Sequence, residues 1–86
     1  MLARFERWNR VAHYYFNLCS DEEEVTDLVG KACEDDVAAL GAALRMAGDV
    51  IQNRLFRNTA IEDGWIEVED EQQRTVLTLP LRAAAY

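Results

Sequence analysis

The segment LRMAGDVIQNRLFRN, residues 44–58, decides between two folds for this chain. Gly48 tolerates left-handed backbone angles, and Asp49 with Gln52 forms an Asp-x-x-Gln pattern that is typical of a helix N-terminus. These residues predict that one helix ends before Gly48 and that a second begins at Asp49. The alternative is one unbroken helix over residues 35–59, in which Gly48 is an ordinary helical residue.

The chain before this segment predicts two more helices. Apolar residues recur every three or four positions in residues 2–18, which indicates one helical face. Four aromatic side chains of that helix are expected to form core or a dimer seam: Phe5, Trp8, Tyr15 and Phe16. Residues 20–23, Ser-Asp-Glu-Glu, match a capping box, and the residues after them predict a helix over 21–30 with a buried apolar face.

The period of the sequence changes after the central segment. Asp63-Gly64 is a turn signal, and beyond it apolar and polar residues alternate. Strands are predicted over residues 64–69 and 74–79, joined by a turn at 70–73. Because two strands are not stable by themselves, the apolar face of this hairpin must lie on the helices.

Together these elements predict an α+β fold that is mostly α. The expected order is four helices, near residues 2–18, 21–30, 35–45 and 49–60, followed by a C-terminal two-stranded β-hairpin. The length suits one small domain, so residues 1–86 are expected to form a single unit.

The order of the elements and several local motifs resemble the winged helix-turn-helix domain family over residues 21–79. Leu40-Gly41-Ala42-Ala43-Leu44 resembles the first helix of that motif, with a small residue where the two helices cross. Ile51 falls where the second helix of the family has a buried aliphatic residue. Residues 63–68, Asp-Gly-Trp-Ile-Glu-Val, look like the entry into the wing, and residues 74–79 look like its returning strand.

The resemblance implies a small DNA-binding transcriptional regulator that acts as a homodimer. The second helix of the motif would lie in the major groove, residues 1–19 would add an aromatic helix for the dimer contact, and residues 80–86 would be a tail. The residues implied in contact with double-stranded DNA are Arg45, Gln52, Asn53, Arg54, Arg57, Asn58 and Arg74. Arg45 stands where the family usually has the turn Gly, which keeps the unbroken helix open as an alternative.

The charge of the chain favours a second hypothesis. The formal net charge is −7, which opposes binding to a partner made of phosphates. The predicted wing is crowded with carboxylates at Glu67, Glu69, Asp70 and Glu71. The alternative function is therefore an acidic, non-enzymatic interaction protein that binds a basic protein partner, in the manner of a phage-type inhibitor or an antagonist of a DNA-binding protein.

Other functions find little support in the sequence. It has no phosphate-cradling Gly-rich loop and no nucleophile with a base at motif spacing, so we expect no enzyme, no cofactor and no small-molecule substrate. Cys19, Cys33 and His13 do not make a metal site at their spacing, and both cysteines are interpreted as buried thiols, with a functional thiol or disulfide as the alternative. No segment predicts a membrane span or a signal peptide, so the expected location is cytoplasmic.

Overall fold

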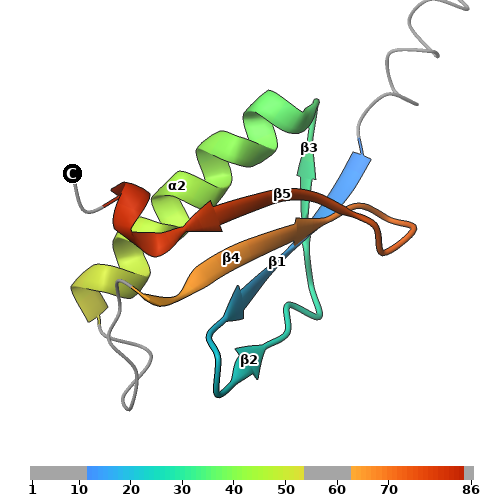
Figure 1. The fold of residues 1–86 in the computed structure, drawn as a ribbon. Coiled ribbons are helices and arrows are strands. Elements are labelled where there is room, and N and C mark those ends of the chain that lie inside the picture. The colour runs from blue at the N-terminus through green and yellow to red at the C-terminus, as the bar shows by residue number, and fades with distance from the viewer. Residues whose placement is uncertain (1–11, 54–62, 85–86) are drawn as a thin grey trace, which may run out of the picture.

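The computed structural model describes residues 12–53 and 63–84, which form one layer of strands and one α-helix that packs on it (Figure 1). In chain order the elements are β1 (Ala12–Cys19), β2 (Glu24–Val25), β3 (Lys31–Cys33), α2 (Asp36–Asn53), β4 (Trp65–Glu69), β5 (Thr75–Pro80) and the 3-10 helix η2 (Leu81–Ala84).

The sheet is antiparallel and is built around β1. The strand order is β2-β1-β4-β5, and β3 also pairs with β1, farther along the same edge as β2. On that edge Leu18 pairs with Val25, and His13 pairs with Ala32. On the other edge Phe16 pairs with Val68 of β4. The strand β1 therefore organises the described part of the fold.

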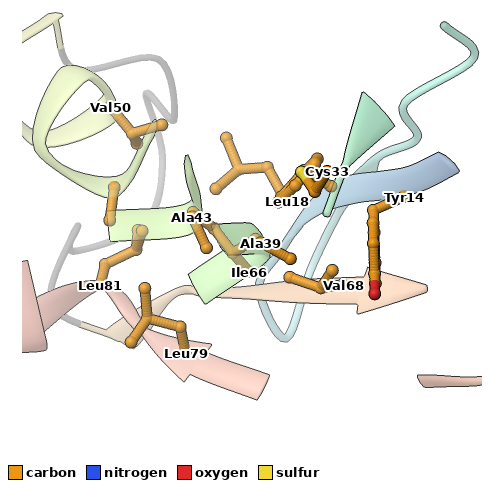
Figure 2. Close-up of a cluster of buried hydrophobic side chains, with 12 residues drawn as sticks. Tyr14, Leu18, Cys33, Ala39, Ala43, Val50, Ile66, Val68, Leu79 and Leu81 are labelled. Atoms are coloured by element: carbon orange, nitrogen blue, oxygen red, sulfur yellow. The ribbon is translucent and has the colours of Figure 1, made fainter. Parts of the chain in front are cut away.

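The core lies between one face of the sheet and α2 (Figure 2). Alternate residues of β1 and β4 point toward the helix, as the period of a strand requires. The helix meets them with alanines and one valine, and these small side chains let it approach the sheet closely. The residues buried here include Tyr14, Phe16, Leu18, Ile66, Val68, Leu79, Leu81, Ala39, Ala43, Ala47 and Val50.

The helix α2 begins close to the start of the helix predicted near residues 35–45 and then continues without a break. The Asp35 Oδ1 atom accepts a hydrogen bond from the N–H of Ala38 at 2.8 Å. The helix passes through Gly48 and Asp49 to Asn53, so the predicted turn is wrong and the unbroken alternative is confirmed as far as Asn53. The reason is that Gly48 keeps a helical backbone angle, and the buried residues on either side of it, Ala47 and Val50, both pack in the core.

The predicted N-terminal helix is wrong for residues 12–18, which form β1, and its first residues lie outside the described ranges. The apolar spacing is ambiguous here because apolar side chains occupy both faces of the segment. Tyr14, Phe16 and Leu18 pack in the core, while Tyr15 lies on the opposite face. Aromatic residues also favour strands, and pairing with β4 decides the outcome.

The predicted helix over residues 21–30 is also wrong. The Ser20 Oγ atom accepts a hydrogen bond from the N–H of Glu23 at 3.1 Å, as a capping box predicts. The Ser20 N–H, however, donates to the Glu23 carbonyl at 2.8 Å, which closes the turn of the β1–β2 hairpin. The same side-chain contact thus serves a turn in place of a helix N-terminus.

The C-terminal hairpin is confirmed, because β4 and β5 lie close to the predicted strands. The Asp70 carboxylate accepts hydrogen bonds from the N–H groups of Gln72 and Arg74, and Gln73 has φ 66° in the turn. The predicted fold class, four helices and a hairpin in the winged helix arrangement, is nevertheless wrong. The described residues contain one α-helix and a five-stranded sheet. None of the described helices is both long and apolar enough to cross a membrane.

Candidate functional site

A groove of about 690 Å³ runs between α2 and the half of the sheet that carries β1 and β2. Phe16 and Leu18 form its floor, and Ala42 and Met46 of α2 form one wall. The β2 strand and the connection from β2 to β3, which lie apart from α2 in Figure 1, form the other wall. The lining residues are Phe16, Leu18, Val25, Thr26, Asp27, Leu28, Lys31, Ala42, Arg45, Met46 and Asp49.

The outer wall of the groove is held in place by Asp27. Its Oδ2 atom accepts a hydrogen bond from the N–H of Phe16 at 3.0 Å, in the gap that β2 and β3 leave on the edge of β1. Its Oδ1 atom accepts from the N–H groups of Val29 and Gly30, each at 3.0 Å. The Asn17 Oδ1 atom accepts from the N–H of Asp27 at 2.9 Å, so both the backbone and the side chain of Asp27 are fixed.

These contacts also set the charge state of Asp27. Burial by itself raises the pKa of this carboxyl, but the N–H groups of Gly30, Phe16 and Val29 outweigh it and hold the pKa below its ordinary value of 3.8. A carboxylate that is surrounded by backbone donors is an anchor for the chain. It is poorly suited to exchange protons with a substrate near neutral pH.

Gly30 and His13 fix the end of the β2–β3 connection that is next to β3. Gly30 has φ 75°, and a Cβ at this position would lie 2.6 Å from His13 Cδ2 and 2.8 Å from the Tyr14 carbonyl oxygen. The His13 Nε2 atom donates a hydrogen bond to the carbonyl of Val29 at 2.8 Å. Only glycine combines this backbone angle with such a close neighbour, so the connection has one preferred shape.

Two large apolar side chains belong to this fixed connection between β2 and β3. Leu28 is 86% exposed and Val29 is 80% exposed, and we call this pair the apolar tip. Val25 of β2 is exposed beside it and continues the apolar surface into the groove. The sequence suggested that these three residues would be the buried face of a helix. The signal that could have found the connection is Asp27 followed by Gly30, a turn pattern.

The segment that carries the outer wall of the groove is strongly acidic. Residues 20–36 contain eight acidic side chains and one lysine, Lys31, a net charge of −7. The lining itself is balanced, because Asp27 and Asp49 stand against Lys31 and Arg45. The negative potential that a ligand meets therefore comes from the segment beside the groove and from the net charge of the chain.

The residues expected to contact DNA do not form a recognition helix that follows a turn. Arg45 and Gln52 are exposed on the unbroken helix α2, and Asn53 is its last residue. Arg74 lies at the end of the β4–β5 hairpin, where its Nε atom pairs with Asp70 Oδ2 at 3.1 Å. The other expected residues, Arg54, Arg57 and Asn58, lie outside the described ranges.

The acidic residues of the expected wing divide between two places. Glu67 and Glu69 lie half-buried on the face of the sheet that points away from α2, where Trp65 Nε1 donates to Glu67 Oε2 at 3.3 Å. Asp70 and Glu71 lie in the hairpin turn. The N–H of Arg74 lowers the pKa of the Asp70 carboxyl most strongly, and burial acts in the opposite direction. The N–H of Gln72 and the Arg74 guanidinium lower the pKa further.

The residues expected in a dimer seam are also separated. Phe16 is only 7% exposed and belongs to the core, so its side chain is not on the surface. Tyr15 is half-buried on the opposite face of the sheet, with its ring 5.3 Å from that of His13. Phe5 and Trp8 lie outside the described ranges.

Cys19 and Cys33 are free, buried thiols, as the sequence predicts. Burial raises the pKa of the Cys19 thiol to about 11, and the charges of Glu67 and Glu24 add to this effect. A thiol with so high a pKa is a poor nucleophile at neutral pH. Within residues 12–53 and 63–84, no group of three or more His, Cys, Asp or Glu residues could hold a metal ion.

The fold and the groove define a small α+β domain in which an α-helix covers an antiparallel sheet and leaves a groove beside it that is lined by apolar and charged side chains. The chain belongs to the family described as a domain of unknown function (DUF6894), whose match spans residues 13–82, from β1 to η2. No curated protein and no solved structure matches the chain.

Proposed function

We propose that this chain is a non-enzymatic interaction protein that binds a basic partner protein through the groove. The observation that carries the proposal is the apolar tip, whose side chains are 86% and 80% exposed although hydrogen bonds of Asp27 fix the chain on which they stand. Exposed apolar side chains on an ordered surface are typical of binding sites. Because the tip is already ordered, it loses little conformational entropy when a partner buries it.

The chemistry of the groove supports binding in preference to catalysis. Its central carboxylate, Asp27, accepts three backbone hydrogen bonds and has a lowered pKa, so it acts as a structural anchor. Six of the eleven lining residues are apolar, and Val25, Leu28 and Met46 among them are available to an incoming side chain. Such a surface gains affinity from burial of apolar area.

The acidic interaction protein was the alternative drawn from the sequence. The DNA-binding function depended on a recognition helix after a turn, and α2 continues through the position of that turn. The net charge of −7 instead favours a positively charged protein. We place this interaction in the cytoplasm, because free thiols at Cys19 and Cys33 suit a reducing compartment.

Site-specific photo-cross-linking in the native host tests the proposal. A photoreactive amino acid replaces Leu28 in one variant and Val37 in a control. Val37 is also an exposed aliphatic residue, at 75%. It lies nine positions before Met46, so at about 100° per residue it points away from the groove. We expect the Leu28 variant to give a discrete adduct with one protein, and that protein should bind the purified chain.

The outcome that contradicts the proposal is equally specific. If both positions give the same adducts, or if neither gives one while the chain is folded and abundant, the groove does not bind a partner protein. Circular dichroism of both purified variants provides the check on folding.

A further inference from the structure

We propose that the groove binds a cationic amphipathic helix of the partner, which lies beside α2 on the same face of the sheet. This inference rests on the proposed function and adds the chemistry of the segment that is recognised. Three features of the structure support it: the position of the groove beside α2, the side chains of the two walls, and the charge of the chain around them.

The first feature is the geometry of the layers. Neighbouring strands lie about 4.8 Å apart, and an α-helix with its side chains is about 10 Å across, so one helix covers about two strands. The helix α2 contacts β3, β4, β5 and η2. Phe16 and Leu18 of β1 are buried at the base of the groove, which opens between α2 and β2. A second helix that lies along this groove would contact α2 on one side and β2 with its connection to β3 on the other.

The second feature is the character of the walls. Ala42 is small and permits close approach of another helix to α2, and Met46 has a flexible side chain that adapts to different apolar neighbours. On the opposite wall Val25 and Leu28 are exposed and aliphatic. A helix with apolar residues at spacings of three and four would place one row of side chains between these walls.

The third feature is charge. The lining itself is balanced, with Asp27 and Asp49 against Lys31 and Arg45, but residues 20–36, which include its outer wall, carry a net charge of −7. The polar side of a bound helix would face this mostly negative surface and the solvent, which favours Lys and Arg there. A second copy of this chain fits the groove poorly, because each copy carries a net charge of −7.

The test measures binding of defined peptides to the full chain by fluorescence anisotropy at low and moderate salt. The probe is a helical peptide of about 18 residues with Leu at spacings of three and four and Lys elsewhere. One control peptide has the same composition in scrambled order. The other replaces every Lys with Glu. Two protein variants complete the design: Leu28→Ser in the groove, and Val37→Ser as the matched exposed residue outside it.

We expect the Leu/Lys helix to bind, and Leu28→Ser to weaken binding at least about tenfold while Val37→Ser changes it less than about twofold. Backbone amide shifts should move at Ala42 and Met46 when the peptide is added. Equal binding of the scrambled peptide would overturn the inference, because charge alone would then explain association. Equal binding of the Leu/Glu peptide, or equal effects of the two variants, would overturn it as well.

The peptide test and the cross-linking test can refute the two proposals independently. A partner that cross-links at Leu28 but presents a strand or an acidic segment would leave the proposed function in place and refute the helix. If the peptide binds in the groove while no protein cross-links there in the host, the proposed function is refuted.

Discussion

The side chain of Asp27 takes the place of a strand beside Phe16. Its Oδ2 atom accepts a hydrogen bond from the Phe16 N–H at 3.0 Å. Phe16 lies between the part of β1 that pairs with β3 and the part that pairs with β2. The other carboxylate oxygen binds the N–H groups of Val29 and Gly30. One side chain thus completes the edge of the sheet and fixes the apolar tip at the mouth of the groove.

Asp27→Asn should lower the free energy of unfolding by about 2 kcal/mol, because an amide offers one acceptor oxygen where the carboxylate offers two. The folded pKa of Asp27 is depressed, so its contribution to stability is present above the ordinary value of 3.8 and is lost as the pH falls through the folded pKa. Urea titrations from pH 7 to pH 2 measure both effects. The exposed residue Glu34 supplies the control, Glu34→Gln, which should leave the acid-dependent part unchanged.

Two glycine substitutions should have opposite signs. Gly30→Ala should destabilise the chain by more than about 1 kcal/mol, because the new Cβ meets His13 and the backbone angle is left-handed. Gly48→Ala should stabilise it by about 0.5 to 1 kcal/mol, because Gly48 lies within a helix and its Cβ would meet nothing within 4 Å. Thermal unfolding of both variants checks this pair. A destabilising Gly48→Ala would speak against an unbroken α2.

Tyr14→Phe should destabilise the chain by about 1 to 2 kcal/mol at neutral pH, since the hydroxyl donates to Asp36 Oδ1 at 2.7 Å and joins β1 to the start of α2. The hydrogen bond to Asp36, and then burial, raise the pKa of Tyr14 to about 12. A raised pKa adds stability that is complete below the ordinary value of 10.0 and declines as the pH rises through the folded value. Denaturation curves between pH 9 and pH 12 measure this decline in the free energy of unfolding, and Tyr14→Phe should not show it.

The Cys19 thiol should react slowly in the folded chain. With a pKa of about 11 it holds little thiolate at pH 8, and its burial adds a steric barrier. Alkylation with iodoacetamide, followed by peptide mass spectrometry, should show labelling at Cys19 at least about tenfold slower in native buffer than in urea. Rapid labelling in native buffer would mean that the face of the sheet opposite α2 opens readily.

Charge reversal at Glu67 and Glu69 should show whether the partner binds in the groove or on the face of the sheet that points away from α2. These residues lie on the face of the sheet away from α2, so Glu67→Lys with Glu69→Lys should weaken binding of the Leu/Lys helix modestly and only at low salt. Leu28→Ser should weaken it at every salt concentration. If the double reversal abolishes binding and Leu28→Ser does not, the open face of the sheet is the partner-binding surface.

The sequence by itself determined the features that depend on neighbours along the chain. The β4–β5 hairpin follows from alternation around a turn, and the start of α2 follows from Asp35, which caps it. The Ser20 hydroxyl accepts the N–H that the sequence suggested. These contacts join residues a few positions apart, so local pattern is enough to predict them.

Only the tertiary structure decided which element each ambiguous segment became. Residues 12–18 suit a helix by spacing and a strand by residue type, and the pairing of Phe16 with Val68 selects the strand. Gly48 suits either a break or a helix, and burial of Ala43, Ala47 and Val50 against the sheet selects the helix. Local pattern could not predict the groove. Its floor, its two walls and the Asp27 carboxylate come from distant parts of the sequence, and they meet only after β1 has paired with β2, β3 and β4.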